Sequence, residues 1–433
     1  MDMDIEKRTL RKITWRIVPF IMILYLIAYI DRVNIGFAAI TMKEDLGFTA
    51  SILGFGAGIF FLGYFLFEVP SNIILHKVGA RIWIARVMVT WGIIAGGMAF
   101  VESSTSFYVM RFLLGVAEAG FFPGIILYLS YWFPARNRAG VIALFMAAAP
   151  IATAIGSPIS AALLEMHGIM GLAGWQWMFL IEAVPAVILG VVVFFYMTDR
   201  PEKAAWLKPD EREWLVKTMQ AEDANKGGQQ HHSILRGLAN PRVLALALIY
   251  FGTSAGLYTL GIWAPQIIKE LGVSSMTVGL LNAIPPIISV VAMILWSRHS
   301  DKTNERTWHV ALACLTAAVG LAIAASTGSM FGLIAALTIV NVGISCSKPP
   351  LWSMPTMFLS GAAAATGIAT INSIGNLGGF AGPAMIGWVK DQTGSFAGGL
   401  YFVAGLLILS TVLTLVLSFT QKNKANSAEL SNS

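Results

Sequence analysis

The sequence predicts an all-α membrane protein whose twelve transmembrane helices form two pseudo-symmetric six-helix bundles. Three observations support this fold class. Of the 433 residues, 56% are hydrophobic and only 12% are charged, whereas soluble domains contain roughly 25% charged residues. The apolar residues fall into runs of about 20, the length that crosses a bilayer. A polar stretch divides these runs into two groups of six, and short motifs recur in both groups.

The spans follow the apolar runs in chain order. The first run follows IEKRTLRK and has no small-residue cleavage site at its end, so it is predicted to be a span rather than a signal peptide. The twelve ranges are 14–38, 51–75, 82–101, 107–131, 139–164, 175–197, 243–267, 276–297, 308–327, 330–354, 362–389 and 398–419.

These spans divide the chain into four parts. Residues 1–198 are predicted to form the N-terminal bundle and residues 243–420 the C-terminal bundle. Between them, 199–242 is dense in charge and is predicted to be a cytoplasmic linker with a short amphipathic helix around 209–222. Residues 421–433 are a predicted cytoplasmic tail.

Lysine and arginine set the predicted orientation, because they are enriched in cytoplasmic segments. With the N-terminus inside, the inner segments, together with Arg16 at the inner end of span 1, hold 22 of the 29 Lys and Arg residues, and the outer loops hold only Lys43, Lys269 and Lys390. We therefore expect a multi-pass protein of a cell membrane, the bacterial inner membrane being favoured, with both termini cytoplasmic. The net charge of +6 follows from this topology and does not indicate nucleic-acid binding.

Two motif pairs recur at a single offset. Arg81 in HKVGARIW matches Arg306 in SDKTNERTW at an offset of 225 residues, and GSP at 156–158 matches AGP at 381–383 at the same offset. Arg81 and Arg306 are assigned to gating or structural roles. A repeat of six plus six spans places a substrate site near the membrane midplane between the bundles.

Charged residues inside the spans mark the candidate site, because a charge at the bilayer centre costs ~2.5–3.5 kcal/mol even on lenient scales. YLIAYIDRVNIGF in span 1 carries Asp31 and Arg32, and RFLLGVAEAGFFPG in span 4 carries Arg111 and Glu118. Arg111 and Glu118 are seven residues apart, so they share a helix face. The two planar guanidinium groups suit a substrate carboxylate, and the neighbouring carboxyl groups suit proton coupling. The alternative is a structural Asp–Arg pair that locks two helices together.

Other polar residues in the spans have structural interpretations, and most of them have a functional interpretation as well. Glu68, just before a proline in FEVPSN, acts at a gate or a broken helix, or carries a proton. Glu182 in span 6 is interpreted as a structural anchor at the outer end. Lys348, in SKPPLWSMP, contacts the substrate or extends to the inner interface. Asn372 and Asn376 share one face of span 11, where they bind substrate or join helices.

The motifs YIDRVNIGFAA, FFLGYFLFEVPSNIILHKVGAR, RFLLGVAEAGFFPG, YWFPARNRA, GWQWMFLIEA and KPPLWSMPT…INSIGNLGGFAGP together resemble the anion:cation symporter family of the major facilitator superfamily. Within this family they are most similar to the bacterial tartrate- and phthalate-type permeases, over most of the chain. The resemblance implies the major facilitator fold and proton-coupled import of a small organic anion by alternating access. The anion would be a tartrate-like dicarboxylate, a sugar acid or an aromatic acid.

The resemblance also implies roles for single residues. The family's acid–arginine pair falls on Asp31 and Arg32, and its span 4 pair falls on Arg111 and Glu118. Its cavity tyrosine, tryptophan and asparagine fall on the substrate-binding candidates Tyr64, Trp352 and Asn372. Glu118 is the main candidate for proton coupling, and Asp31 is the competing one. Some sugar-acid transporters of the family carry a glutamine where this chain has Ala149, which argues against a hydroxyl contact at that position.

Other functions are open at this stage. Sodium-coupled transport, exchange transport and a non-transporting membrane sensor on the same scaffold are alternatives to proton symport. The sequence contains no metal constellation, serine elbow or phosphate loop, so we expect neither an enzyme nor a cofactor. The expected partners are the organic anion, protons and the lipid bilayer, with no nucleic acid, and the expected state is a monomer.

Overall fold

The computed structural model of the chain describes residues 2–224, 240–357 and 361–432, and within these ranges every regular element is a helix. The first part contains α1 (Asp2–Leu46), α2 (Ala50–Val78), α3 (Ala80–Gly97), α4 (Ser104–Glu118), α5 (Phe121–Trp132), α6 (Ala135–Met146), α7 (Ala148–Leu164), α8 (Gly174–Tyr196) and α9 (Pro209–Ala224). The second contains α11 (Pro241–Lys269), α12 (Ser275–Thr303), α13 (Thr307–Ser326), α14 (Met330–Ser353), α15 (Gly361–Asn376), α16 (Gly378–Thr393) and α17 (Ala397–Asn432). Four short 3₁₀ turns also occur: η1 (Met98–Phe100), η2 (Ile169–Gly171), η3 (Pro201–Lys203) and η4 (Pro355–Met357).

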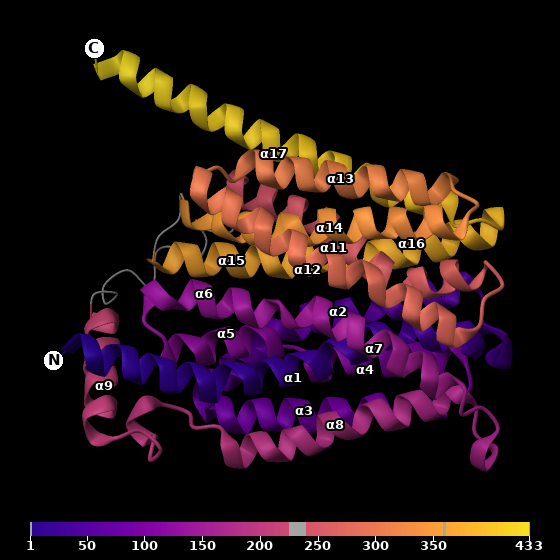
Figure 1. Ribbon diagram of the computed structural model, residues 1–433, viewed down its shortest axis with the longest axis horizontal. Helices are drawn as coiled ribbons and strands as arrows, with labels where there is room; N and C mark the ends of the chain where they lie inside the picture. Colours follow the sequence, from indigo (N-terminus) through magenta and orange to yellow (C-terminus); the bar gives the residue numbers. More distant parts are fainter. Residues whose placement is uncertain (1, 225–239, 358–360, 433) are drawn as a thin grey trace.

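The long helices run roughly parallel to one axis and form two groups. Figure 1 shows α1–α8, in indigo to magenta, below α11–α17, in orange to yellow. Both termini lie at the same end of the bundle, where α1 and α17 extend beyond their neighbours (Figure 1). Because α17 continues to Asn432, the tail predicted from residue 421 is an extension of the last helix.

Eleven helical segments in the described ranges are long and apolar enough to span a membrane. The eleventh predicted span, 362–389, is not among them, because it is divided into α15 and α16, each of 16 residues, with Leu377 between them. Two other predicted spans are interrupted but continuous in direction: 107–131 comprises α4 and α5, and 139–164 comprises α6 and α7. The sequence therefore located the spans correctly but did not reveal these breaks.

Several helices start where a side chain can satisfy a free backbone N–H. Ser103 accepts a hydrogen bond from Ser106 N at the start of α4, and Ser274 and Ser329 cap α12 and α14 in the same way. Asn240 caps α11, whose first residue is Pro241, a position where the missing proline N–H costs nothing. These caps end the loops that separate successive apolar runs.

The helix crossings between the two groups follow the 225-residue repeat. At the crossing of α1 and α11, a Cβ added at Gly36 would lie 2.4 Å from the carbonyl oxygen of Gly261, its equivalent at that offset. A Cβ at Gly54 of α2 would lie 2.4 Å from the Pro383 oxygen of α16. Its equivalent, Gly279 of α12, approaches the Ser157–Pro158 backbone of α7 in the same way. Symmetry-related helix pairs thus make their close contacts through equivalent residues, as the two-bundle prediction requires.

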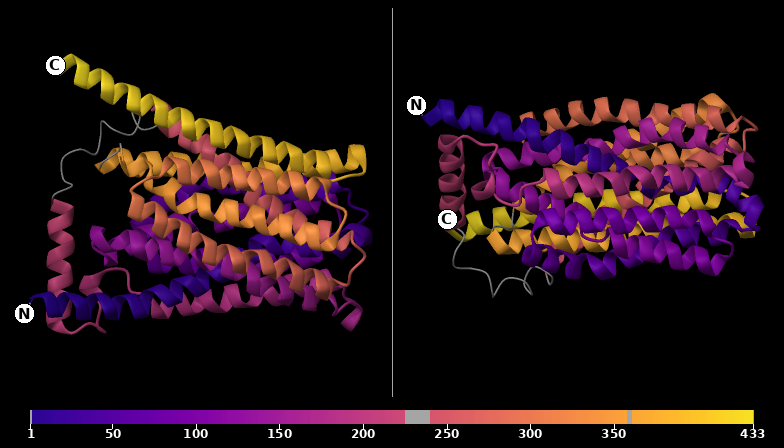
Figure 2. Two further views of the ribbon diagram at one scale, coloured as in Figure 1. Left: turned by 45° about the horizontal axis from the view of Figure 1, so that its top comes forward. Right: turned by 90° about the horizontal axis from the view of Figure 1, so that it is seen from below.

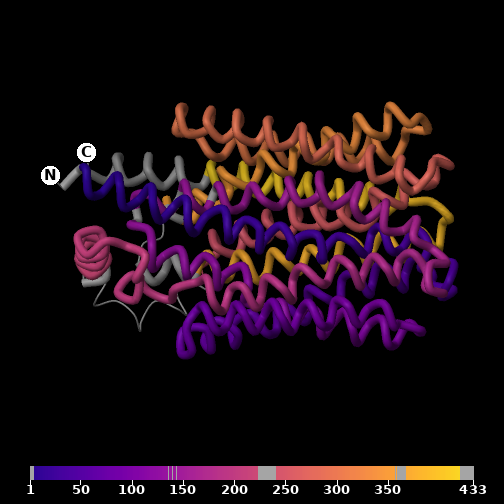
Figure 3. The backbone as a smooth tube through the Cα atoms, turned by 60° about the horizontal axis from the view of Figure 1, so that its bottom comes forward, coloured from indigo at the N-terminus to yellow at the C-terminus, as the bar shows by residue number. Residues whose placement is uncertain are grey.

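The linker helix α9 lies across one end of the bundle. Figures 1, 2 and 3 all place it beside the N-terminal end of α1, with its axis nearly perpendicular to the long helices. Arg8 of α1 forms ion pairs with Asp210 and with Glu211, and Lys12 Nζ lies 2.9 Å from Glu211 Oε2. These contacts join the linker to the start of the first span. Residues 225–239 of the predicted linker, which include His231 and His232, lie outside the described residues.

Candidate functional site

The centre of the candidate site is a buried ion pair between α1 and α4. Arg32 Nε donates to Glu118 Oε1 at 2.5 Å, and both side chains are almost completely buried. The sequence placed an arginine and an acid on each of these spans, and the structure pairs the arginine of one with the acid of the other. Arg32 therefore bonds to Glu118 rather than to its neighbour Asp31.

A break in span 4 positions the acid of this pair. Glu118 is the last residue of α4, and α5 starts after Gly120, which has φ +86°. A left-handed backbone of this kind favours glycine. The C-terminal end of a helix carries a partial negative charge, so a carboxylate there is unfavourable unless a cation or a proton compensates it. This placement suits a carboxyl group that alternates between a pair with arginine and a bound proton.

Aromatic side chains surround Arg32 on its other sides. Its Cζ lies 5.2 Å from the centroid of Tyr64 and 5.7 Å from that of Phe60, both on α2. Its Nη1 donates to the hydroxyl of Tyr258 on α11 at 3.3 Å. Because α11 belongs to the second group of helices, this hydrogen bond connects the charged cluster to the other bundle. Tyr64, which the resemblance assigns to the cavity, thus lies beside Arg32.

Arg111 also lies near the ring of Phe60. Its Cζ is 5.2 Å from the Phe60 centroid, and its Nε and Nη2 donate to the carbonyl oxygens of Gly56 and Ala57 on α2. Arg111 shares α4 with Glu118 as predicted, but its hydrogen bonds go to backbone rather than to a carboxylate. A guanidinium held by neutral carbonyls keeps its charge available to an incoming anion.

Asp31 points away from Arg32. Its Oδ2 accepts a hydrogen bond of 2.6 Å from Trp91 Nε1 on α3, and its side chain is buried. The two neighbours therefore contact different helices, as expected for adjacent helical residues about 100° apart. Asp31 is oriented by a neutral donor and has no ion pair with another described residue.

The four charged side chains retain unused hydrogen-bonding atoms. Within the described residues, Arg32 Nη2, Arg111 Nη1, Asp31 Oδ1 and Glu118 Oε2 are buried and have no hydrogen-bond partner. Buried polar atoms are normally satisfied, so these atoms mark where another polar group would bind. The formal charges sum to zero when all four groups are ionised. The arrangement can accept an anion on the arginines together with protons on the acids.

A second polar contact joins the two groups of helices nearer the linker end. Glu68 of α2 accepts hydrogen bonds from Asn372 Nδ2 at 2.7 Å and from Ser373 Oγ at 3.1 Å, both on α15. The positions equivalent to Glu68 and Asn372 in the repeat are Met293 and Ala147. This polar contact therefore has no counterpart at the symmetry-related crossing. In this conformation the Asn372 amide, a predicted substrate ligand, is occupied by Glu68.

The remaining predicted substrate residues lie on the second group of helices. Trp352 packs edge-on against Tyr250, with ring centroids 4.9 Å apart, and its buried Nε1 has no partner among the described residues. Asn376 is buried one turn beyond Asn372. Lys348 is half-buried in α14. The side chains of Lys348 and Asn376 form no hydrogen bond or ion pair with any other residue that the structure describes.

The other predicted structural residues lie outside this cluster. Glu182 of α8 accepts hydrogen bonds from Asn34 and Ser160, so it joins three helices of the first group. Arg81 Nε lies 3.9 Å from Asp199 Oδ2 near the end of α8. Arg306 Nη2 lies 2.7 Å from Asp301 Oδ1. The ion pairs of Arg81 and Arg306 remain within their own groups of helices.

Sequence reasoning missed three residues of the site. Trp91 and Tyr258 lie in apolar spans and bear single polar atoms, which do not distinguish them from packing residues. Tyr258 did have a signal, because the 225-residue offset carries Val33, next to Arg32, onto Tyr258. Ser373, the second donor to Glu68, follows the predicted Asn372 directly.

A bundle of eleven or more membrane-spanning helices in two repeated groups, with a charged cluster buried where they meet, defines a multi-pass membrane transporter. The chain belongs to the Major Facilitator Superfamily, whose sequence pattern matches residues 21–383. This membership agrees with the family resemblance in the sequence.

Two transporters of known sequence match this chain over nearly their full lengths. A protein of Agrobacterium vitis named "Putative tartrate transporter" is 75% identical over 420 residues, covering 97% of this chain and 97% of its own. The "Putative metabolite transport protein NicT" of Pseudomonas putida is 42% identical, covering 94% and 93%. The relatives are named as transporters, in keeping with the non-enzyme prediction.

The fold is also similar to solved structures. A D-xylose-proton symporter superposes with a TM-score of 0.74 at 16% identity, covering 92% of this chain and 97% of that one. A bacterial homologue of the lysosomal transporter Spinster, in an inward-facing conformation, gives 0.74 at 15% identity, covering 93% and 96%. At these identities the likeness concerns the fold alone.

Proposed function

We propose that the protein imports a small organic anion by proton symport with alternating access. The observation that carries this proposal is the neutral cluster of Arg32, Arg111, Asp31 and Glu118, in which every member keeps an unused buried polar atom. The arginines would bind the anion, and Glu118 and Asp31 would bind protons. The 75% identical relative bears the name of a tartrate transporter, which supports a tartrate-like dicarboxylate among the candidate anions.

Charge balance supports coupling through both acids. The empty cluster is neutral with two cations and two carboxylates. A dianion bound with two protons would also leave it neutral, whereas a dianion alone would leave a charge of minus two in a poorly solvated site. Burying uncompensated charge is costly. Two closed states are therefore favoured: the empty carrier with both acids ionised, and the carrier that holds the dianion and two protons. On this basis transport of a dianion with two protons moves no net charge.

The two parts 1–198 and 243–420 would move as bundles about the midplane site, with 199–242 as their linker. The excess of lysine and arginine at the linker end supports cytoplasmic termini in a bacterial inner membrane. Glu68, Asn372 and Ser373 would close the inner end. A substrate carboxylate that reached Asn372 would compete with Glu68 for the same amide, so occupancy would weaken the inner closure. A monomer contains all these parts.

The experiment that tests the proposal is uptake of radiolabelled tartrate into proteoliposomes. An inward proton gradient should drive accumulation, and a protonophore should abolish it. At a fixed pH gradient, a potassium diffusion potential of either sign should leave the rate of dianion uptake unchanged. A panel of organic acids, including sugar acids and aromatic acids, should compete with the label in order of affinity.

Three outcomes would contradict the proposal. Undiminished uptake with sodium as the sole gradient would indicate sodium coupling. Uptake that required an organic anion inside the vesicles would indicate exchange. The absence of uptake for every acid that stabilises the protein against heat would favour a sensor.

A further inference from the structure

A basic hollow lies at the linker end of α1, far from the charged cluster. Its volume is about 880 Å³, and five of the nine side chains that line it are basic, with Asp4 as the one acid. Two tryptophans, Trp15 and Trp206, form part of its wall. No step of the proposed transport cycle uses these residues.

The positive charge of this hollow is only partly neutralised. Arg8 and Lys12 pair with the acids of α9. Lys7 and Arg11 are exposed, and within the described residues they form no ion pair or hydrogen bond. Two basic side chains, one turn apart on the same helix face, are therefore available to an anion.

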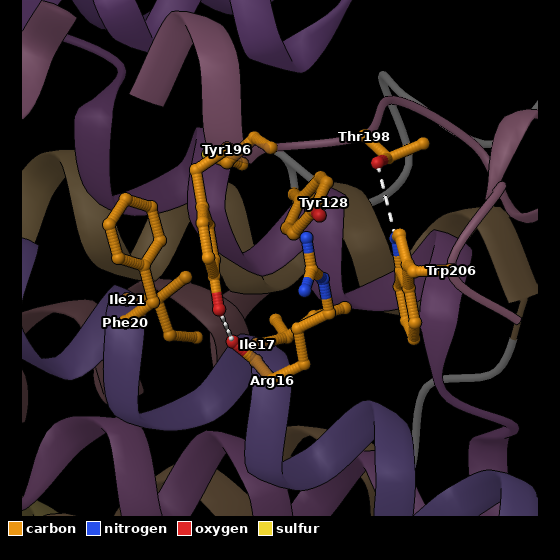
Figure 4. A pocket seen from close by; sticks show the side chains of 9 residues that line it. Arg16, Ile17, Phe20, Ile21, Tyr128, Tyr196, Thr198 and Trp206 are labelled. Carbon is orange, nitrogen blue, oxygen red and sulfur yellow. Dashed lines mark hydrogen bonds between the residues drawn. The ribbon is translucent and has the colours of Figure 1, made fainter. Parts of the chain in front are cut away.

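The inner wall of the hollow is a fixed aromatic surface. Arg16 Cζ lies 4.6 Å from the ring centroid of Tyr196 and 4.8 Å from that of Trp206. Figure 4 shows this arginine between the rings, in a smaller pocket beside the hollow. The Tyr196 hydroxyl donates to the Arg16 carbonyl oxygen, and Trp206 Nε1 donates to Thr198 Oγ1 (Figure 4). These hydrogen bonds hold the wall in place beside the free lysine and arginine.

The exposed face of α1 changes along its length from basic to apolar residues, as expected where a helix enters a membrane. At intervals of four residues, it presents Lys7, Arg11, Trp15, Pro19 and Ile23, all exposed. Trp15 is 72% exposed, and tryptophan is enriched at the headgroup level of a bilayer. Apolar residues follow Trp15, and the basic residues precede it. Lys7 and Arg11 are thus placed at the depth of phosphate groups.

We propose that the hollow beside Lys7, Arg11 and Trp15 is a binding site for the headgroup of an anionic phospholipid of the adjacent leaflet. Basic clusters directly outside a transmembrane helix, and basic pockets between such helices, recognise anionic headgroups in this way. The phosphate binds Lys7 and Arg11, and the acyl chains run along Trp15 and Ile23. A lipid bound at this site holds α1 at a fixed depth in the bilayer. This matters for transport because α1 also carries Arg32.

Native mass spectrometry of the full-length protein, titrated with dioleoyl phosphatidylglycerol or dioleoyl phosphatidylcholine, tests the site. The parent should bind phosphatidylglycerol more tightly than phosphatidylcholine. The double variant Lys7→Gln/Arg11→Gln should bind phosphatidylglycerol roughly 30-fold more weakly, since each basic residue near an anionic surface contributes a factor of about five. Neither side chain has a partner among the residues that the structure describes, so the melting temperature in detergent should not change. Trp15→Ala should weaken binding of both lipids.

The matched control is Arg298→Gln/Lys302→Gln, which removes two positive charges from the same end of α12. The affinity of this control for phosphatidylglycerol should stay within about twofold of the parental affinity, because distant sites affect one another only weakly. If both double variants lost the same affinity for phosphatidylglycerol, the binding would reflect general charge attraction rather than a site, and the proposal would be overturned. Equal binding of the two lipids by the parent would also overturn it. Glycerol 1-phosphate that bound as tightly as phosphatidylglycerol would identify a soluble anion as the ligand instead.

Discussion

Arg32 of α1 and Glu118 of α4 form a buried ion pair at the point where a membrane-spanning segment breaks. Arg32 Nε lies 2.5 Å from Glu118 Oε1, and Glu118 is the last residue of its helix. The arginine also reaches Tyr258 of the second bundle. One side chain therefore links the proposed proton site, the proposed anion site and the interface between the two bundles.

Replacing Arg32 by lysine tests its part in anion binding. Arg32→Lys keeps a cation beside Glu118 but loses the planar fork that binds a carboxylate through two N–H groups. A hydrogen bond to a charged group is worth about 1.5–3 kcal/mol, so substrate affinity should fall roughly 10- to 150-fold at normal expression. Isothermal titration calorimetry of the purified variant with the transported anion measures this change.

Arg86→Lys is the matched control, because Arg86 also lies within a span but packs on the ring of Trp83, outside the cluster. It should bind the anion like the parent. Normal transport by Arg32→Ala would make the Arg32–Glu118 pair structural and would remove the basis for anion binding.

Glu68 should determine how tightly the inner end closes. Glu68→Ala removes both hydrogen bonds to Asn372 and Ser373, and no equivalent contact exists at the other crossing. Spin labels at Lys77 and Met357, on exposed positions of the two groups near that end, should move to longer mean distances in pulsed electron resonance. Glu68→Gln, which can still accept from Asn372, should show a smaller change.

Glu102→Ala, an exposed carboxylate at the opposite end, serves as the control and should leave the distances unchanged. Identical distance distributions for Glu68→Ala and the parent would show that the α2–α15 contact does not hold the inner end closed.

The contact between α1 and α9 should depend on pH through Glu211. Burial raises the pKa of this carboxyl group, but the Lys208 backbone N–H and the neighbouring Lys12 and Arg8 lower it more, so the pKa lies below the ordinary 4.5. Since the folded state favours the ionised form, this stabilisation is complete above pH 4.5 and is lost as the pH falls through the lower, folded-state pKa.

Thermal unfolding of the parent and of Glu211→Gln measures this pH dependence. At pH 7 the variant should melt roughly 2–4 °C lower, and the difference should shrink below pH 4.5. Glu213→Gln, whose side chain pairs with Lys217 on the exposed face of α9, should melt like the parent at both pH values. A difference that persisted unchanged in acid would exclude ionised Glu211 as its source.

The fold was largely predictable because hydropathy and the 225-residue repeat are properties of the sequence itself. The repeat even equates the glycines at the α1–α11 crossing, Gly36 and Gly261. The helix breaks were harder to predict. At Gly120 the change depends on a left-handed backbone angle, and nothing in an apolar run containing many glycines distinguishes this one.

The sequence predicts which residues make up the candidate site, but it does not predict which of them contact one another. Intramembrane charge identified Arg32, Arg111, Asp31 and Glu118, since such residues are costly in lipid. Which arginine meets which acid depends on helix rotation and on the rotamers of long side chains. The contact of Glu68 with Asn372 joins residues 304 positions apart, so neither local spacing nor the repeat could predict it.

Glu118 is proposed to couple anion transport to the proton, and the variant Glu118→Gln tests this role most directly. Glutamine has the size of the protonated acid but cannot release a proton. The variant should bind the anion, because the arginines remain. It should also exchange labelled for unlabelled anion at a rate near that of the parent, since the loaded carrier still closes.

Asp31→Asn, assayed in parallel, tests whether Asp31 is the coupling residue instead. Glu182→Gln is the matched control, because Glu182 is a buried carboxyl group outside the cluster. The deciding measurement is net accumulation of labelled anion against its gradient under an imposed inward proton gradient. We expect Glu118→Gln to exchange the anion but to fail to accumulate it. Accumulation by Glu118→Gln equal to that of the parent would exclude Glu118 as the coupling residue and would transfer this role to Asp31.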